Sequence, residues 1–147
     1  MKTLKVLFFS LIVLSPLSIA SAEYTVKMLN NGKEGLMVFE PSFLSIQPGD
    51  TVLFKATDVS HNSASIQGMI PEGATAWMGA MSQDVKVIFD KEGIYVYQCT
   101  PHSMMAMVGV IKVGEPINLE QVKEKAESQK QLFVMNKERL SGYLSKL

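Results

Sequence analysis

Short runs of alternating hydrophobic and polar residues fill the chain between residues 23 and 114. In the first run, Tyr24, Val26 and Met28 share one side of an extended chain, with the period of two that is typical of a half-buried strand. The sequence Asn30-Asn31-Gly32 then predicts a turn. Similar runs, bounded by proline, glycine and aspartate, cover residues 37–40, 43–46, 51–56, 85–89, 94–99 and 107–113. Short strands without helices between them predict an all-β sandwich or barrel with Greek-key connections.

Residues 69–84 break this alternation. The segment reads MIPEGATAWMGAMSQD, and its proline, glycines and polar residues predict a loop with at most a helical turn. Trp77 and Met78 within it can be buried in the core or exposed at the surface, because the hydrophobic pattern of the segment does not decide between the two.

The pattern changes to a helical one in residues 115–147. Leu119, Val122 and Ala126 recur at helical spacing after Asn118, a residue type that favours the N-cap of a helix. A second amphipathic run carries Leu132, Phe133, Leu140, Tyr143 and Leu144. The segment is too small to bury its apolar face alone. We therefore expect a helical extension that packs on the β-sandwich as a structural cover.

The first 22 residues have the features of a secretory signal peptide. Lys2 and Lys5 form a positively charged amino end, an apolar run follows, and Ala20-Ser21-Ala22 provides small residues for cleavage. A transmembrane anchor is the alternative, but serine and proline interrupt the apolar run, which falls short of the ~20 residues that a span needs. We expect export to the periplasm, cleavage after Ala22, and no membrane insertion of the mature chain.

Composition limits the classes of function. The chain of 147 residues has 14 basic and 14 acidic residues, and loss of Lys2 and Lys5 with the signal peptide leaves 12 against 14, a net charge of −2. This balance lacks the basic character expected of a nucleic-acid-binding protein. The length fits one domain, with its strands in residues 23–114. We expect the protein to be a monomer. A single cysteine excludes an internal disulfide, and an unpaired exported thiol needs a role such as metal ligation.

The candidate chemistry lies in one loop and one distant histidine. Cys99, His102 and Met107 have the spacing C-x2-H-x4-M between two predicted strands, so a tight loop can direct a thiolate, an imidazole and a thioether at one ion. His61, the only other histidine, follows the strand over 51–56 and can lie at the same end of the sandwich. Together these residues form the His2Cys set with a weak axial methionine that is typical of blue copper sites.

Each of these residues has a structural explanation when it is taken alone, because cysteine and methionine are common in cores and loop histidines often face solvent. Their joint occurrence favours copper. A zinc site would use more cysteine or histidine and no thioether. A Cys–His catalytic pair would need a glycine-rich nucleophile turn and an orienting residue, for which only Asn62 is near. We therefore do not expect an enzyme.

The motifs CTPHSMMAM and DVSHN, with VKMLN, GLMVFEPSFLSIQPGDTVLF, IPEGA and the helical tail in the same order, resemble the cupredoxins, or blue copper proteins, and among them the pseudoazurins. The resemblance covers about residues 23–147. It implies a Greek-key β-barrel of about eight strands, two C-terminal α-helices and one type 1 copper ion that cycles between Cu(I) and Cu(II). The implied copper ligands are His61, Cys99, His102 and Met107.

The resemblance also separates the methionines of the loop. Met107 matches the axial ligand, Met105 matches a family methionine that is not a ligand, and Met104 has no counterpart. Asn62 resembles the residue that joins the two ligand loops and donates a backbone N–H to the thiolate, a type of contact that tunes a metal site. Pro101 lacks an N–H, so it limits hydrogen bonding around the thiolate and stiffens the loop.

The function implied by the resemblance is a diffusible periplasmic electron carrier, with His102 as the exit toward a redox partner. Copper nitrite reductase and c-type cytochromes are the candidate partners. Pseudoazurins commonly surround this face with lysines, but the matching positions here hold Asn31, Val59, Met78 and Gln98. Because electrostatic complementarity mainly sets association rate and partner choice, we expect a less acidic partner or apolar docking, and weak salt dependence.

The alternative function is a periplasmic copper carrier or chaperone. Soft thioethers that could bind Cu(I) occur at Met78, Met81, Met104 and Met105. Methionine is also an adaptable contact residue, and a carrier has little need for a loop that fixes cysteine, histidine and methionine together. A carrier should release Cu(I) readily to a chelator, whereas a type 1 site should not.

Overall fold

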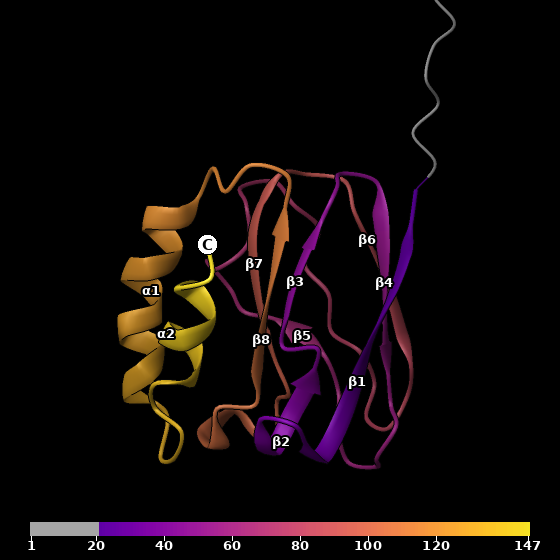
Figure 1. Ribbon diagram of the computed structural model, residues 1–147, viewed down its shortest axis with the longest axis vertical. Coiled ribbons are helices and arrows are strands. Elements are labelled where there is room, and N and C mark those ends of the chain that lie inside the picture. Colours follow the sequence, from indigo (N-terminus) through magenta and orange to yellow (C-terminus); the bar gives the residue numbers. More distant parts are fainter. Residues whose placement is uncertain (1–20) are drawn as a thin grey trace, which may run out of the picture.

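Two four-stranded sheets face each other in the computed structural model, which describes residues 21–147 (Figure 1). The strands are β1 (Glu23–Gly32), β2 (Gly35–Glu40), β3 (Phe43–Ile46), β4 (Asp50–Lys55), β5 (Ala64–Ser65), β6 (Val85–Phe89), β7 (Gly93–Gln98) and β8 (Val108–Val113). The helices are η1 (Ser103–Met105), α1 (Leu119–Gln131) and α2 (Arg139–Leu144). The predicted signal peptide lies outside the described residues, apart from its last two positions. None of the described helices is long and apolar enough to cross a membrane.

The strand order shows how distant parts of the chain become neighbours. One sheet has the order β2-β1-β4-β6 and the other has the order β3-β8-β7-β5. Strands β1 and β4 run parallel, as do β3 and β8, and the other pairs are antiparallel. Parallel neighbours cannot be joined by a tight hairpin, so the chain crosses between the sheets. The prediction of an all-β sandwich of about eight strands with two C-terminal helices is confirmed.

The two faces of strand β7 belong to two separate hydrophobic clusters. Tyr95, Tyr97 and Cys99 point into the space between the sheets, while Ile94 and Val96 point to the helices. All five side chains are at most 2% exposed. A strand that is buried on both faces carries a continuous apolar run, which explains the sequence IYVY. The cysteine therefore extends from a strand that is buried on both faces.

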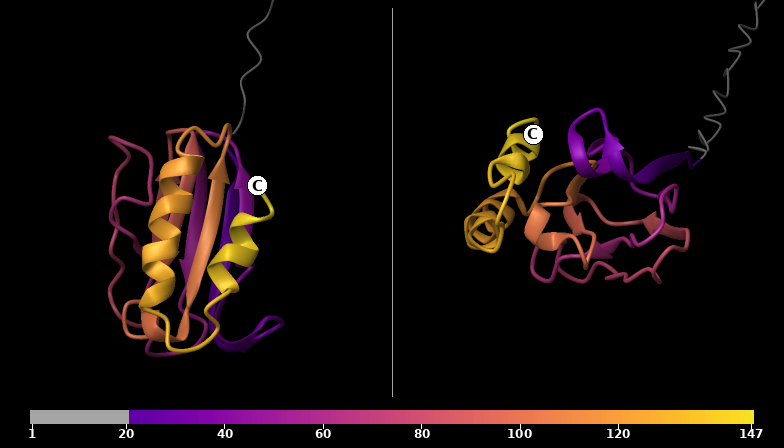
Figure 2. Two further views of the ribbon diagram at one scale, coloured as in Figure 1. Left: turned by 90° about the vertical axis from the view of Figure 1, so that its left-hand side faces the viewer. Right: turned by 90° about the horizontal axis from the view of Figure 1, so that it is seen from below.

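The two C-terminal helices cover the outer face of the sheet that contains β7 and β8 (Figure 2). Helix α1 contacts β7, and helix α2 contacts mainly β8. Asn118 occupies the N-cap position of α1, as predicted, but its side chain does not cap the helix. Instead, it donates to the Ile94 carbonyl at 2.9 Å and accepts from the Ile94 N–H at 2.7 Å. This residue thus connects the helix to β7.

The predicted turn at Asn30-Asn31-Gly32 is wrong. All three residues belong to β1, and Asn31 pairs with Leu36 in β2. The chain reverses at Lys33-Glu34, with Gly35 in a positive-φ conformation that glycine adopts at little cost. The longer strand carries Asn30 to the end of the sheet at which His61 lies.

The segment 69–84 is a loop, as predicted, but it has no helical turn in the described structure. One residue of the segment, Met78, forms a bridge with Ala64, beside the short strand β5 that the sequence pattern did not reveal. Trp77 lies half-buried and stacks on Phe54 with ring centroids 5.7 Å apart. Met78 is 76% exposed. The bridge therefore gives this short segment an extended conformation, in which Trp77 faces the core and Met78 faces the surface.

Candidate metal centre

The predicted ligand loop connects β7 and β8 at the lower end of the sandwich in Figure 1. Cys99 follows the last residue of β7, His102 precedes the single turn η1, and Met107 directly precedes β8. The Cys99 N–H donates to the Met107 carbonyl at 3.0 Å, and the Met107 N–H donates to the His102 carbonyl at 3.3 Å. These backbone bonds close the loop. Cys99 and Met107 therefore lie at the ends of two strands, and His102 lies between them in the closed loop.

His61 reaches the same point from the other sheet. It lies in the loop after β4, is fully buried, and places Nδ1 3.6 Å from Cys99 Sγ and 3.2 Å from His102 Nδ1. Cys99 Sγ and His102 Nδ1 are 3.3 Å apart. The structure thus brings together the thiol and both imidazoles that the sequence singled out, with all three donor atoms within 4.8 Å of one another.

The spacing of these donors fits a metal ion. An ion that binds nitrogen at about 2.0–2.1 Å and sulfur at about 2.3 Å, as zinc does, holds three donors in a plane about 3.5–3.8 Å apart. The observed separations of 3.2, 3.3 and 3.6 Å are close to this range. Two nitrogens and one thiolate sulfur in a trigonal arrangement form the donor set of a blue copper centre.

The side chain of Asn30 sets the tautomer of His61. Its Oδ1 lies 3.0 Å from His61 Nε2, and because an amide oxygen only accepts, Nε2 must carry the proton. The lone pair of Nδ1 is then free to bind a metal, which is the usual role of a hydrogen bond on the opposite ring nitrogen. Sequence reasoning missed Asn30, because it lies 31 residues from His61 and no local pattern connects them.

Asn62 joins the two ligand loops. Its Oδ1 accepts from the N–H of Thr100 at 2.8 Å and from the hydroxyl of Thr100 at 2.7 Å, and its Nδ2 donates to the Gly79 carbonyl at 3.2 Å. The side chain is 3% exposed, so these bonds form largely away from water. Pro101 lies next to Thr100, is exposed, and has no N–H to offer.

The protonation of the site depends on burial. Burial raises the pKa of the Cys99 thiol, although hydrogen bonds from the N–H groups of Asn62 and His102 act against this rise. Burial also lowers the pKa of His61, as does the neighbouring His102, while Asp58 opposes the shift. Both groups therefore favour their neutral forms. A metal ion must displace the thiol proton to bind the thiolate.

The three methionines of the loop differ in burial. Met107 is fully buried in the same hydrophobic cluster as Cys99. Met104 is 61% exposed, and Met105 is half-buried in the single turn η1. Only Met107 combines burial with a place beside the strand end, which a ligand of fixed position requires.

Comparison with known proteins identifies the family. Residues 26–114 match the model of the copper-binding proteins of the plastocyanin/azurin family. A pseudoazurin of Methylorubrum extorquens is 44% identical over 112 residues, which cover 76% of each chain. A pseudoazurin structure from Sinorhizobium is 47% identical, covers 76% of this chain and 94% of that one, and has a TM-score of 0.68. The native pseudoazurin structure from Hyphomicrobium denitrificans is 40% identical, covers 85% and 98%, and has a TM-score of 0.76. The chain therefore belongs to the pseudoazurins, which are copper-containing electron-transfer proteins of the plastocyanin/azurin family and not enzymes.

Proposed function

We propose that His61, Cys99 and His102 hold one type 1 copper ion, with Met107 as its axial ligand, in a periplasmic electron carrier. The observation that carries the assignment is the convergence of two imidazole Nδ1 atoms and one thiol within 4.8 Å. The soft sulfur donors suit Cu(I) and the imidazoles also suit Cu(II), so bound copper supplies a one-electron couple.

The residues around the donors keep them in place during electron transfer. Asn30 fixes the ring of His61, and Asn62 ties the loop of His61 to Thr100, the residue that follows Cys99. Cys99 itself extends from a strand that is buried on both faces. A ligand set that cannot relax toward the geometry preferred by one oxidation state changes little when the electron moves. This rigidity supports fast transfer in both directions.

The first experiment is the visible and EPR spectrum of the protein loaded with Cu(II). We expect an intense thiolate-to-copper band and a narrow copper hyperfine splitting, which Cys99→Ser abolishes. Met107→Leu should change the band pattern, whereas Met105→Leu, in the same loop, should not. A pale protein that loses Cu(I) readily to a chelator would instead favour the carrier function, and a shift in the Met105 variant alone would refute the axial assignment.

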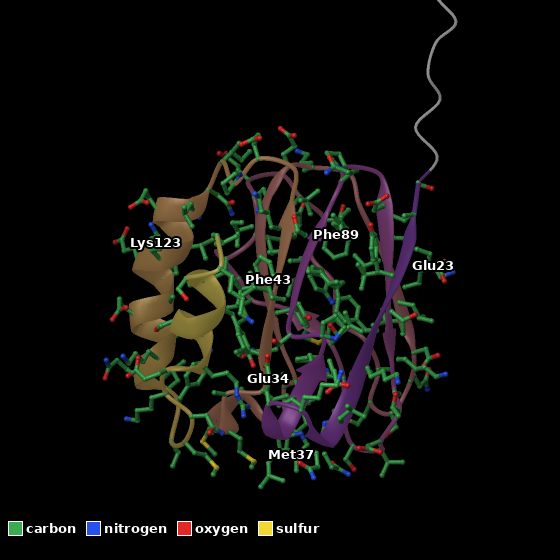
Figure 3. All side chains as sticks on the ribbon, in the orientation of Figure 1. Glu23, Glu34, Met37, Phe43, Phe89 and Lys123 are labelled. Atoms are coloured by element: carbon green, nitrogen blue, oxygen red, sulfur yellow. The ribbon has the colours of Figure 1, made fainter. Side chains whose placement is uncertain are left out.

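The surface for a redox partner lies around the ligand loops. We call it the apolar face; its exposed members are Leu36, Val59, Met78, Met81, Met104 and Met135, between 44% and 76% exposed. All but Leu36 are close to a ligand loop in the chain or through a backbone bond; for example, the Met135 N–H donates to the Met104 carbonyl. Leu36 pairs with Asn31, the neighbour of Asn30 in β1. Figure 3 shows sulfur-bearing side chains gathered at this end of the sandwich, where Met37 is labelled. His102, half-buried among them, is the proposed exit for the electron.

The partner of the apolar face should carry little negative charge. Val59 and Met78 are well exposed at two of the positions where pseudoazurins commonly have lysines, and thioethers provide adaptable contact instead of charge. Copper nitrite reductase and c-type cytochromes are the candidate partners. Electron-transfer rates with each, measured by stopped flow against ionic strength, should fall only weakly with added salt. A steep fall would refute apolar docking.

The periplasmic location rests on the signal peptide features of the first 22 residues. Expression of the full chain in a bacterium should yield a periplasmic protein that begins at Glu23. Mass spectrometry of the fractionated cells checks this location. A cytoplasmic protein that retains Lys2 and Lys5 would contradict it.

A further inference from the structure

The chain has one arginine, Arg139, at the start of α2, and its guanidinium binds backbone carbonyls only. Within the described residues it forms no ion pair. Nη1 donates to Met37 O at 3.0 Å and to Ala106 O at 3.1 Å, and Nη2 donates to Leu36 O at 3.2 Å and to Glu34 O at 3.4 Å. One side chain of the C-terminal tail thus connects the β1–β2 hairpin to the loop that carries the copper ligands.

The two carbonyls that share Nη1 belong to strained residues. Met37 has a φ of 49° and Ala106 has a φ of 55°, and residues other than glycine adopt this left-handed conformation only at an energetic cost. Such conformations persist when neighbouring groups hold them in place. Arg139 binds both carbonyls with a single nitrogen, so it stabilises both left-handed residues at once.

Ala106 directly precedes Met107, and its carbonyl belongs to the peptide group that joins them. The same oxygen accepts from the Val108 N–H at 3.0 Å, which closes a tight turn centred on Met107, of the kind found at strand ends. Arg139 therefore binds the oxygen that defines this turn. A rotation of that peptide group would move the backbone from which the Met107 side chain extends.

Other tail residues bind the neighbouring carbonyls. The Val134 N–H donates to Met104 O at 2.8 Å, and Asn136 Nδ2 donates to Met105 O at 3.3 Å. With Arg139 on Ala106, three successive carbonyls of the ligand loop are bound by the tail. Arg139 is the last of the three and the nearest to Met107.

We propose that Arg139 is a positioning residue for the copper centre: its guanidinium holds the Ala106 peptide group and thereby sets the place of the Met107 thioether beside the His61, Cys99 and His102 donors. This inference rests on the proposed function, because it takes Met107 as the axial ligand. The axial contact tunes the potential and electronic structure of a blue copper site, so the effect is measurable in the metal's spectra.

The test compares Arg139→Gln with Tyr143→Phe, a variant of the same helix. Tyr143 also anchors the tail to the hairpin, through its hydroxyl and Glu34 Oε2 2.6 Å apart, but within the described residues its hydroxyl forms no hydrogen bond to the ligand loop. In the copper-loaded protein, Arg139→Gln should shift the ratio of the charge-transfer bands, the rhombicity of the EPR signal and the reduction potential. Tyr143→Phe should leave all three at the wild-type values. Equal shifts in the two variants, or none in Arg139→Gln, would overturn the inference.

A second readout needs no copper. In the apo-protein, the Val108 amide should exchange with solvent at least tenfold faster in Arg139→Gln than in Tyr143→Phe, because the turn around Met107 has lost the hydrogen bond from the guanidinium to Ala106 O. Equal exchange rates would also overturn the inference. If the glutamine variant does not fold, Arg139→Lys replaces it, and the same spectral shift is expected. A wild-type protein without the blue spectrum would refute the proposed function itself, which is a separate outcome.

Discussion

Replacement of Asn30 by alanine tests how much the copper site depends on one hydrogen bond. Asn30 Oδ1 accepts from His61 Nε2 at 3.0 Å, and His61 is fully buried. Without this bond the ring can take the other tautomer, which would place a proton on Nδ1, the atom that faces Cys99 and His102. Loss of such a contact behind a metal ligand typically costs 10–100-fold in affinity, or about 1.4–2.7 kcal/mol of binding free energy.

Asn31→Ala is the matched control, because it removes the same side chain one position along β1. Asn31 is exposed and its side chain makes no hydrogen bond within the described structure. Competition with a chelator of known affinity should give weaker copper binding for Asn30→Ala and wild-type binding for Asn31→Ala. Asn30→Asp, which retains an acceptor, should recover most of the loss. Equal affinities for the two alanine variants would refute the argument that Asn30 orients His61.

Two further predictions concern the stability of the fold. Tyr97 has the one buried hydroxyl without a hydrogen-bond partner in the described residues, and such a group destabilises a fold by about 1–3 kcal/mol. Tyr97→Phe should therefore raise the free energy of unfolding. A lower value in urea denaturation would contradict this. Burial would raise the pKa of Glu34, but hydrogen bonds from Tyr143 and Ser42 and the charges of Lys146 and Arg139 lower it overall. A carboxylate with a lowered pKa stabilises the fold above its unfolded pKa, near 4.5, and this contribution is lost as the pH falls through the lower folded value. Tyr143→Phe should therefore lower the free energy of unfolding of the apo-protein by about 1 kcal/mol at pH 7 and by less at pH 3. An equal loss at both pH values would refute the argument that Tyr143 stabilises the ionised Glu34 carboxylate.

The strands and the candidate ligands could be predicted because their signals are local. Alternation over a few residues reveals most strands, and the spacing of Cys99, His102 and Met107 fits within one loop. His61 could be added because the chain has only two histidines. Strand β5 has two residues, too few for any periodicity to show.

The contacts that hold the ligands could not be predicted, because they join residues far apart in the sequence. Asn30 lies 31 residues from His61, and Arg139 lies 33 residues from Ala106. Asn118 shows how a local rule fails: it stands at the N-cap position, but Ile94, 24 residues away, satisfies its side chain better than the helix does. The sequence therefore predicts the candidate copper ligands but not the contacts that orient them.

The C-terminal extension has more than the covering role that its amphipathic pattern indicates. Its apolar face buries the outer side of β7 and β8, the two strands that carry the ligand loop at their ends. Its polar groups then bind the carbonyls of Met104, Met105 and Ala106 in succession. Apart from these contacts, the loop is held by its own backbone bonds and by Asn62, which accepts from the N–H and the hydroxyl of Thr100. Because the loop supplies the His102 and Cys99 donors and the proposed Met107 thioether, we expect the rigidity of the copper site to depend in part on a segment that provides none of the proposed ligands.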